Sequence, residues 1–241
     1  MQAFADDPEH PGRRVWRLSR AGAVGSGIVM LLCVVGAALL TYVALTLVPL
    51  AGAIPLGLCA LGMLALAAYV RRDRRGKAGG AILLDEDGLT LDLPRDRSLA
   101  HHAPAFHGTI RRDAIASVAH RLEGYGAQGL AMVQRSYWLV LRLGPPLLLF
   151  EDRGIGSAQA TDPMMPLAEE IARRCGLPLI ERPMARGCGG ILGAWFAQGP
   201  ALDAPAMTDR AQRWIWRRVW ITGSLASLTM LALILGMMIG R

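Results

Sequence analysis

Three histidines lie close together in one stretch of the chain, at His101, His102 and His107. Imidazole nitrogens bind transition metals, but a metal site also needs further ligands and acceptors that orient the rings. The surrounding segment has no Cys or Asp at a spacing that would complete such a site, and proline-containing loops are commonly exposed. We therefore expect residues 94–108 to form a solvated loop, and we predict no metal site.

Ser117 and His120, with Asp113 close by, are the residue types of a nucleophile and its base. On a strand, residues three apart point to opposite faces, so this spacing does not form a nucleophile–base pair. No G-x-S-x-G turn accompanies them. We predict no catalytic residues, and we do not expect the chain to be an enzyme.

The glycines and lysine of residues 76–80 are the residue types of a phosphate-binding loop. Such a loop requires a preceding strand and a Lys-Ser or Lys-Thr pair, and both are missing from this stretch of the sequence. We interpret residues 71–80 as a basic hinge instead. The four cysteines have neither disulfide nor zinc-type spacing, so we predict no cofactor.

Two long stretches without charge define the elements around these residues. No Asp, Glu, Lys, Arg or His occurs in residues 21–70 or 219–240, which are 50 and 22 residues long. A helix needs about 20 apolar residues to cross the hydrocarbon core of a bilayer. The first stretch predicts transmembrane helices at about 22–47 and 56–70, and the second predicts a third at about 219–239.

Half of the basic residues flank these apolar stretches. The net charge is +7, and 13 of the 26 Lys and Arg residues lie beside a predicted span. Basic flanks stay on the cytoplasmic side, and the anionic inner leaflet attracts them. We therefore predict a lipid bilayer with an anionic inner leaflet as a partner, and no nucleic acid. The residues expected at this membrane surface are Arg71, Arg72, Arg74, Arg75, Lys77, Arg213, Arg217 and Arg218.

The basic flanks also predict an orientation. The N-terminus and the segment after the second span are expected in the cytoplasm, and the C-terminus outside, in a multi-pass protein of the inner (plasma) membrane. Aromatic residues are common at membrane interfaces. Those near the predicted cytoplasmic interfaces are Trp16, Tyr69, Trp214, Trp216 and Trp220.

Between residues 81 and 183 the hydrophobic pattern changes to that of a small α+β domain. An acidic turn that ends in glycine separates the first two apolar runs, which indicates a β-hairpin. The predicted strands are 81–84, 89–93, 110–122, 137–143 and 147–150. Residues 167–175 have the apolar stripe of an amphipathic helix, and Gly176 is placed to end it. We expect an antiparallel sheet or barrel closed by this helix.

The order of these parts resembles that of bacterial membrane proteins with a pleckstrin-homology-like (PH-like) domain after a transmembrane hairpin. The matching pieces are the hairpin at 82–89, the stretch 110–118 with its Ile-x-Ser-Val ending, and the helix at 167–179. The chain departs from that family in the loop 94–108 and in the third span. The resemblance covers residues 22 to about 180, and it implies a PH-like fold, an interaction role and no catalytic residues.

The sequence divides into six parts. They are a basic cytoplasmic N-terminus (1–20), a transmembrane hairpin (21–70), a basic hinge (71–80), a cytoplasmic PH-like domain (81–183), a Gly-rich linker (184–209) and the third transmembrane helix with its basic start (210–241). Residues 187–202 are expected at the membrane surface or, alternatively, in a flexible linker. We predict a non-catalytic, membrane-anchored interaction or scaffold module with a membrane or cytoplasmic protein partner. The alternatives are an accessory or stabilising subunit of a larger membrane complex and, more remotely, an enzyme or transporter.

Overall fold

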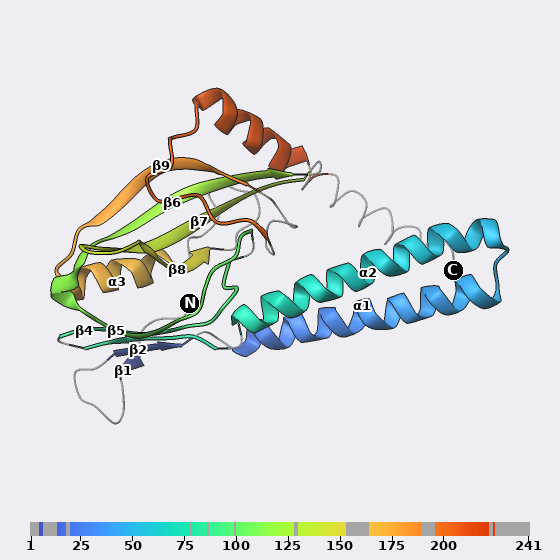
Figure 1. Ribbon diagram of the computed structural model, residues 1–241, viewed down its shortest axis with the longest axis horizontal. Helices are drawn as coiled ribbons and strands as arrows, with labels where there is room; N and C mark the ends of the chain where they lie inside the picture. Colours follow the sequence, from blue (N-terminus) through green and yellow to red (C-terminus); the bar gives the residue numbers. More distant parts are fainter. Residues whose placement is uncertain are drawn as a thin grey trace.

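The computed structural model describes residues 5–6, 14–17, 20–77, 79–85, 87–98, 100–127, 130–152, 164–188, 196–221 and 224. Within these segments, two long helices project side by side from a domain built of two β-sheets (Figure 1). The fold therefore combines an apolar helical hairpin with a strand-rich domain, as the hydrophobic pattern predicts.

Helices α1 (Arg20–Thr46) and α2 (Leu50–Lys77) form the hairpin. Both are long and apolar enough to cross a membrane, with mean hydropathies of 2.7 over Val24–Thr46 and 2.1 over Leu50–Gly76. Many Leu, Ile and Val side chains along them are exposed, and exposed apolar surface of this extent is typical of contact with lipid or another protein. Two candidate spans are thus present. The predicted third span at 219–239 lies outside the described residues, except for 219–221 and Ser224.

Helix α2 extends beyond the predicted span of 56–70 at both ends. It begins before Pro55, and it continues through residues 71–77, where the sequence analysis predicts a hinge. The reason is packing, because Arg72, 6% exposed, contacts the domain, and Asp73, 8% exposed, accepts a hydrogen bond from Ser26 of α1. The hairpin and the domain are therefore joined by continuous helix up to Lys77.

The first sheet has the strand order β1-β2-β3-β4-β5, with every neighbouring pair antiparallel. Its strands are β1 (Ala5–Asp6), β2 (Arg14–Arg17), β3 (Ala81–Leu84), β4 (Gly88–Leu93) and β5 (Phe106–Arg111). The predicted hairpin of β3 and β4 is confirmed. A short turn, η1 (Arg112–Ala114), divides the strand predicted at 110–122 and leads from this sheet to the second.

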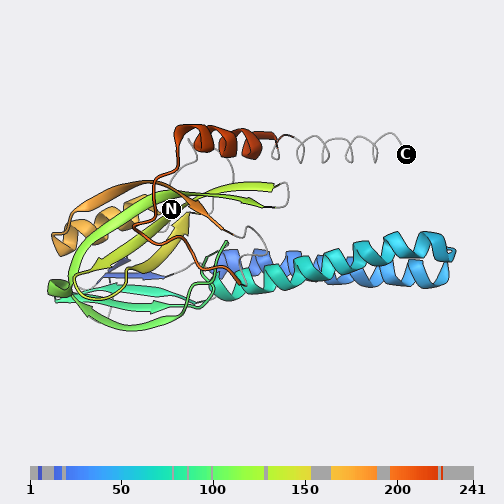
Figure 2. The ribbon, with the colours of Figure 1, turned by 45° about the horizontal axis from the view of Figure 1, so that its top comes forward.

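The second sheet has the order β8-β7-β6-β9, in which β9 is parallel to β6 and the other pairs are antiparallel. Its strands are β6 (Ile115–Ala127), β7 (Leu130–Leu141), β8 (Leu147–Asp152) and β9 (Leu179–Gly187). Strands β6 and β7 form a long hairpin that extends toward the C-terminal part of the chain (Figure 2).

The main hydrophobic core lies between the two sheets and is closed by helix α3 (Met165–Cys175). Alternation along β4 buries its leucines, and the apolar stripe of α3 is buried in the same core, as predicted. Buried members include Leu89, Leu91, Leu93, Val118, Leu139, Leu149, Leu167 and Ile171. Gly176 ends the helix in the left-handed conformation with φ 61°, which confirms the predicted closing helix.

The N-terminal segment belongs partly to this domain. Strand β2 pairs with β3, and it places Trp16 in the core at 2% exposure, with its ring centroid 5.9 Å from that of Phe150. Arg14 of the same strand donates to Glu170 on α3 at 3.1 Å. The expectation that Trp16 lies at the membrane interface is therefore wrong, because its ring fills space between the sheets.

The C-terminal part covers the second sheet. Residues 196–203 run beside the loop 94–105, where His102 N donates to the carbonyl oxygen of Ala197 at 2.9 Å. A helix over 209–221 then packs Ile215 and Val219 against the far end of β6 and β7. Of the predicted linker, residues 196–209 are thus packed on the domain, and residues 189–195 lie outside the described part of the chain.

Candidate functional site

The end of helix α2 is fastened to the loop 94–105 by Arg72. Its guanidinium donates to the carbonyl oxygens of Ser98 at 2.8 Å and His101 at 2.9 Å, and it lies 3.4 Å from Asp96 Oδ1. Gly76 packs so tightly on the same loop that a Cβ there would lie 2.6 Å from the Asp96 carbonyl oxygen. The loop is therefore held against α2 rather than free in solvent.

This loop places the imidazole of His101 inside the domain at 2% exposure. Its Nε2 lies 3.2 Å from Glu151 Oε1 on β8 and 4.0 Å from Glu123 Oε2 on β6. The two glutamates are themselves buried, at 4% and 0% exposure. The predicted solvated loop is therefore wrong for His101, and we call these three residues the histidine–glutamate centre.

The other two histidines of the stretch lie elsewhere. His102 is half-buried, and its Nδ1 lies 3.1 Å from Asp96 Oδ1. His107 is exposed on β5 and pairs with Asp92 of the neighbouring strand β4. His102 is therefore only partly solvated, and His107 is solvated but lies in a strand, so the predicted loop ends before residue 106.

Uncharged and charged donors surround the two carboxylates. Glu123 Oε1 accepts from Arg121 Nε at 3.0 Å and Ser136 Oγ at 2.7 Å. Glu123 Oε2 accepts from the Tyr125 hydroxyl at 2.6 Å, and Glu151 Oε1 accepts from Gln134 Nε2 at 2.9 Å. Every one of these donors is at most 2% exposed. The network fixes the positions of both carboxylates, because buried polar groups without partners would be costly.

The electrostatics of the centre follow from burial and from the two carboxylates. Burial lowers the pKa of His101, but Glu151 and Glu123 outweigh this and raise it above its ordinary value. Burial, followed by the charge of Glu123, raises the pKa of Tyr125, so its hydroxyl stays protonated and donates. Burial lowers the pKa of Arg97 to about 10, against the raising effect of Glu151. The glutamates thus favour the protonated form of His101, whereas burial disfavours the charged form of Arg97.

The sequence analysis did not predict Glu123 and Glu151 as site residues, because the pattern around them is typical of a solvent-exposed sheet face. Polar residues alternate along both strands, in Arg121-x-Glu123-x-Tyr125 and Gln134-x-Ser136, as they do on exposed antiparallel sheets. Segments distant in sequence bury this face. Arg121 donates to the carbonyl oxygens of Pro200 and Ala201, which ties the segment 196–203 over it.

A cavity of about 530 Å³ lies beside the centre. His101 forms part of its wall, together with Trp138, Arg182 and the segment 198–203. Of the histidine–glutamate centre, His101 alone lines this cavity, and Glu123 and Glu151 lie behind it.

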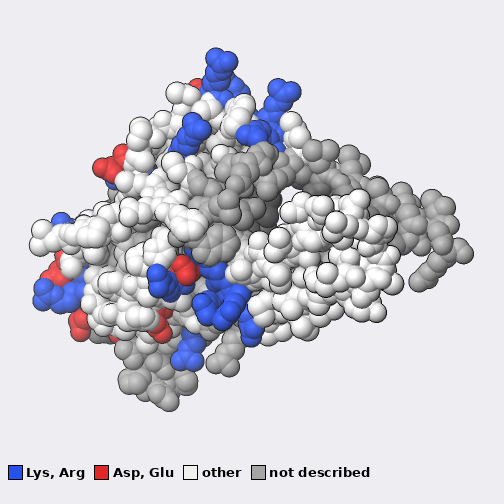
Figure 3. All heavy atoms as spheres, turned by 45° about the vertical axis from the view of Figure 1, so that its right-hand side comes forward, with Lys and Arg blue, Asp and Glu red and all other residues white. Residues whose placement is uncertain are grey.

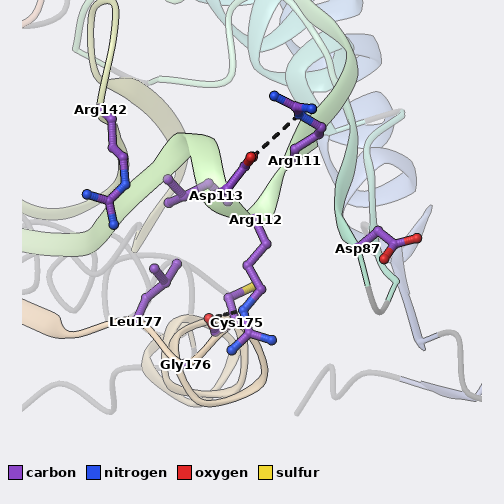
Figure 4. A pocket seen from close by; sticks show the side chains of 9 residues that line it. Asp87, Arg111, Arg112, Asp113, Arg142, Cys175, Gly176 and Leu177 are labelled. Carbon is purple, nitrogen blue, oxygen red and sulfur yellow. Dashed lines mark hydrogen bonds and ion pairs between the residues drawn. The ribbon is translucent and has the colours of Figure 1, made fainter.

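A second hollow, of about 700 Å³, lies at the end of the domain opposite the hairpin (Figures 1 and 4). Arg112 and Arg142 point toward the C-terminal end of α3, where Arg112 Nε donates to the Cys175 carbonyl oxygen. Arg111 lies 3.4 Å from Asp113 across the rim. Among the described residues, the Arg142 guanidinium forms no hydrogen bond or ion pair. This hollow could accept an anionic group at Arg142.

The residues predicted at the membrane surface fall into two groups. Arg71, Arg74 and Arg75 are exposed at the domain end of the hairpin, and Arg213 and Arg217 are exposed on the helix over 209–221. Figure 3 shows basic side chains where the uncharged hairpin meets the domain.

Three of the predicted surface residues differ from these two groups. Arg72 is buried in the contacts described above, Arg218 lies over the Trp214 ring at 4.5 Å, and the side chain of Lys77 lies outside the described part. The prediction that Arg72 lies at the membrane surface is therefore wrong, because its side chain is buried against the loop 94–105.

Ser117, His120 and Asp113 are not brought together. Ser117 and His120 are both buried on β6, and because they are three residues apart their side chains point to opposite faces of the strand. Asp113 lies in the turn η1 and is exposed. The His120 ring packs near Tyr137 instead, with centroids 6.0 Å apart.

Comparison with protein-family models, with curated proteins and with solved structures finds no match to this chain.

Proposed function

We propose that this protein is a membrane-anchored interaction module of the inner membrane, whose arginine-lined hollow binds an acidic segment of a protein partner. The observation that carries this proposal is the docking of α2 on the loop 94–105 through Arg72. A domain fixed on its hairpin keeps a fixed direction relative to the bilayer. The hollow, at the end of the domain opposite the hairpin, then faces the cytoplasm.

The charge of the hollow supports an anionic ligand group. Arg111, Arg112 and Arg142 line it together with only two carboxylates, Asp87 and Asp113. Leu143, next to Arg142 in the sequence, is 91% exposed and offers an apolar contact beside the charge. Arginine is well suited to carboxylates because its planar guanidinium donates two parallel hydrogen bonds.

In this proposal the domain has a PH-like fold and the chain spans the membrane three times. Two sheets closed by α3 support the fold, to which β1, β2 and β9 would be additions. The helix over 209–221 runs in the direction of the hairpin and ends with Trp220 and Ile221 exposed, which supports a third span at 219–239 (Figure 2). Basic residues at both exits support a cytoplasmic domain and an outside C-terminus.

Site-specific photo-crosslinking in native membranes tests the partner. A crosslinker at Leu143 is expected to capture one reproducible protein, whereas a crosslinker at the exposed Glu181 on β9 is the matched control. Arg142→Glu should abolish the Leu143 product and Arg142→Lys should retain much of it. A product that is absent, or that survives Arg142→Glu unchanged, contradicts the proposed binding surface.

Reporter fusions test the orientation separately. A reporter active only outside the inner membrane should be silent at the N-terminus and active after residue 241. Activity at both ends, or at neither, would contradict the proposed three spans.

An accessory subunit of a larger membrane complex is the second candidate. Gly25, Gly57 and Gly62 have open space where a Cβ would lie, so they do not contribute to the packing of α1 on α2. Small residues on an outer helix face let another transmembrane helix approach closely. Extraction of the native assembly in mild detergent, followed by size measurement, should show a species larger than one chain, and a monodisperse monomer would argue against this candidate.

A further inference from the structure

We propose that His101, Glu123 and Glu151 bind one divalent transition-metal ion of the Zn²⁺ class. Their ligand atoms all lie within 4.8 Å of one another, and no other such group of three occurs among the described residues. This metal site goes beyond the proposed interaction role and does not depend on it.

The orientation of His101 leaves a place for a cation. Its Nδ1 lies 3.3 Å from the carbonyl oxygen of His102, which can only accept a hydrogen bond. A hydrogen on Nδ1 leaves a lone pair on Nε2 in the neutral ring, and this lone pair faces two carboxylates. Three acceptors within 4.8 Å of one another in a buried site repel one another. Arg121 offsets part of this repulsion on the far oxygen of Glu123, and a cation between the three acceptors would offset the rest.

A proton on Nε2 is the alternative cation, and the geometry favours the metal. Nε2 is buried and 3.2 Å from Glu151 Oε1, yet it makes no aligned hydrogen bond. A tetrahedral ion with bonds of about 2.1 Å holds its ligand atoms about 3.4 Å apart. The separations of 3.2 Å and 4.0 Å from Nε2 to the two carboxylates bracket this value.

The surrounding hydrogen bonds are those that orient metal ligands. The carbonyl oxygen of His102 orients the ring of His101, while Tyr125 and Gln134 hold the two carboxylates. Such outer partners set the tautomer of a ligating histidine and the positions of ligating carboxylates. Two carboxylates and a neutral imidazole around a divalent ion also give these ligands and the ion a net charge of zero, beside the single positive charge of Arg121.

The cavity of about 530 Å³ is the space nearest to the three ligands, and His101 is the ligand that lines it. In this proposal an ion and a water molecule as fourth ligand would enter from the cavity by a small movement of the His101 ring. Gly199 closes over the ring, since a Cβ at that position would lie 2.7 Å from the imidazole. The ion would hold the loop 94–105 on the second sheet, and through Arg72 it would also strengthen the attachment of α2.

Metal binding is best measured on the full-length protein in detergent, with any purification tag removed and resident metal stripped by a chelator. Titration with Zn²⁺ followed by calorimetry should give one site per chain, and loading should raise Tm. Co²⁺ should give visible bands of a four- or five-coordinate nitrogen and oxygen site without thiolate charge transfer. The Co²⁺ spectrum of the wild-type protein needs no variant, so it remains decisive if a substitution unfolds the domain.

Matched variants locate the site. His101→Gln and Glu151→Gln should each weaken Zn²⁺ binding at least about 10-fold and remove the Tm increase. His107→Gln, which alters an exposed imidazole paired with Asp92, should retain binding within about 2-fold. Gly199→Ala should also weaken binding, because the added methyl group displaces the His101 ring although none of the three ligand residues is replaced.

Folded wild-type protein that binds neither ion at one site per chain would overturn the proposal and leave the proton as the cation. Binding that is equal in His101→Gln and wild type would overturn it as well, since the ion would lie elsewhere.

Discussion

Arg72 Nη2 donates to the carbonyl oxygen of His101 at 2.9 Å, and so joins the end of an apolar helix to the residue whose ring faces two buried glutamates. The hairpin and the polar face of the second sheet are thus linked through one residue, His101. A substitution in the hairpin end of this contact is therefore expected to alter the stability of the sheet end, and the reverse.

Arg72→Ala should destabilise the domain and loosen the loop 94–105. The substitution leaves the carbonyl oxygens of Ser98 and His101 buried without their donor, at a cost of about 2–4 kcal/mol. Hydrogen exchange over residues 94–103 should become faster and Tm should fall. Arg75→Ala, an exposed change on the same helix, should alter stability by less than about 0.5 kcal/mol. Equal effects of the two changes would contradict the docking role of Arg72.

Gly76→Ala should also weaken the contact between α2 and the loop 94–105 and lower stability, although the same substitution within a helix usually raises stability. Alanine in place of glycine within a helix normally stabilises by roughly 0.5–1 kcal/mol. At Gly76 the new Cβ would lie 2.6 Å from the Asp96 carbonyl oxygen, so the helix or the loop must move. Gly79→Ala, where a Cβ meets nothing within 4 Å, is the control. Thermal unfolding of the two variants should show a lower Tm for Gly76→Ala only.

Trp16→Ala should cost about 3–5 kcal/mol, as large-to-small changes in a core do. Trp16 is 2% exposed between the sheets, whereas Trp214 is 49% exposed on the helix over 209–221. Chemical unfolding in detergent should therefore separate Trp16→Ala from Trp214→Ala by several kcal/mol. Similar losses for both tryptophans would show that β2 does not contribute to the core.

Glu170 should make stability depend on acid pH. Burial raises its pKa, but hydrogen bonds from Arg173 and Arg174, with the charges of Arg173 and Arg14, lower it below its ordinary value of 4.5. A lowered folded-state pKa contributes stability that is complete above about pH 4.5 and is lost as the pH falls through the folded pKa. The difference in unfolding free energy between wild type and Glu170→Gln should be largest near pH 6 and shrink toward about pH 3. A constant difference would contradict this.

The elements that sequence alone predicts are those with a local signal. Uninterrupted apolar residues predict α1 and α2, alternation around an acidic turn predicts β3 and β4, and an apolar stripe before Gly176 predicts α3. Each signal is contained within a few turns of helix or one hairpin, and the structure agrees with all of them.

The remaining features depend on contacts between distant segments. In the sequence Trp16 has the position of an interfacial residue, but the pairing of β2 with β3 buries it. Arg72 has the position of a lipid-facing residue, but the loop 94–105 packs on it. His101 meets Glu123 and Glu151 only because two chain segments fold over a polar sheet face. Alternating polar residues on a strand predict an exposed face, and the local sequence does not indicate that distant segments of the chain will bury it.

Strand β2 precedes the hairpin in the chain and strand β3 follows it, yet the two strands pair in one sheet. The sheet therefore cannot be completed until both apolar helices have been made and their ends lie on the same side. In a chain that spans the membrane as proposed, insertion of only one helix would leave β2 and β3 on opposite sides of the bilayer. Pairing of β2 with β3 would then require insertion of the whole hairpin.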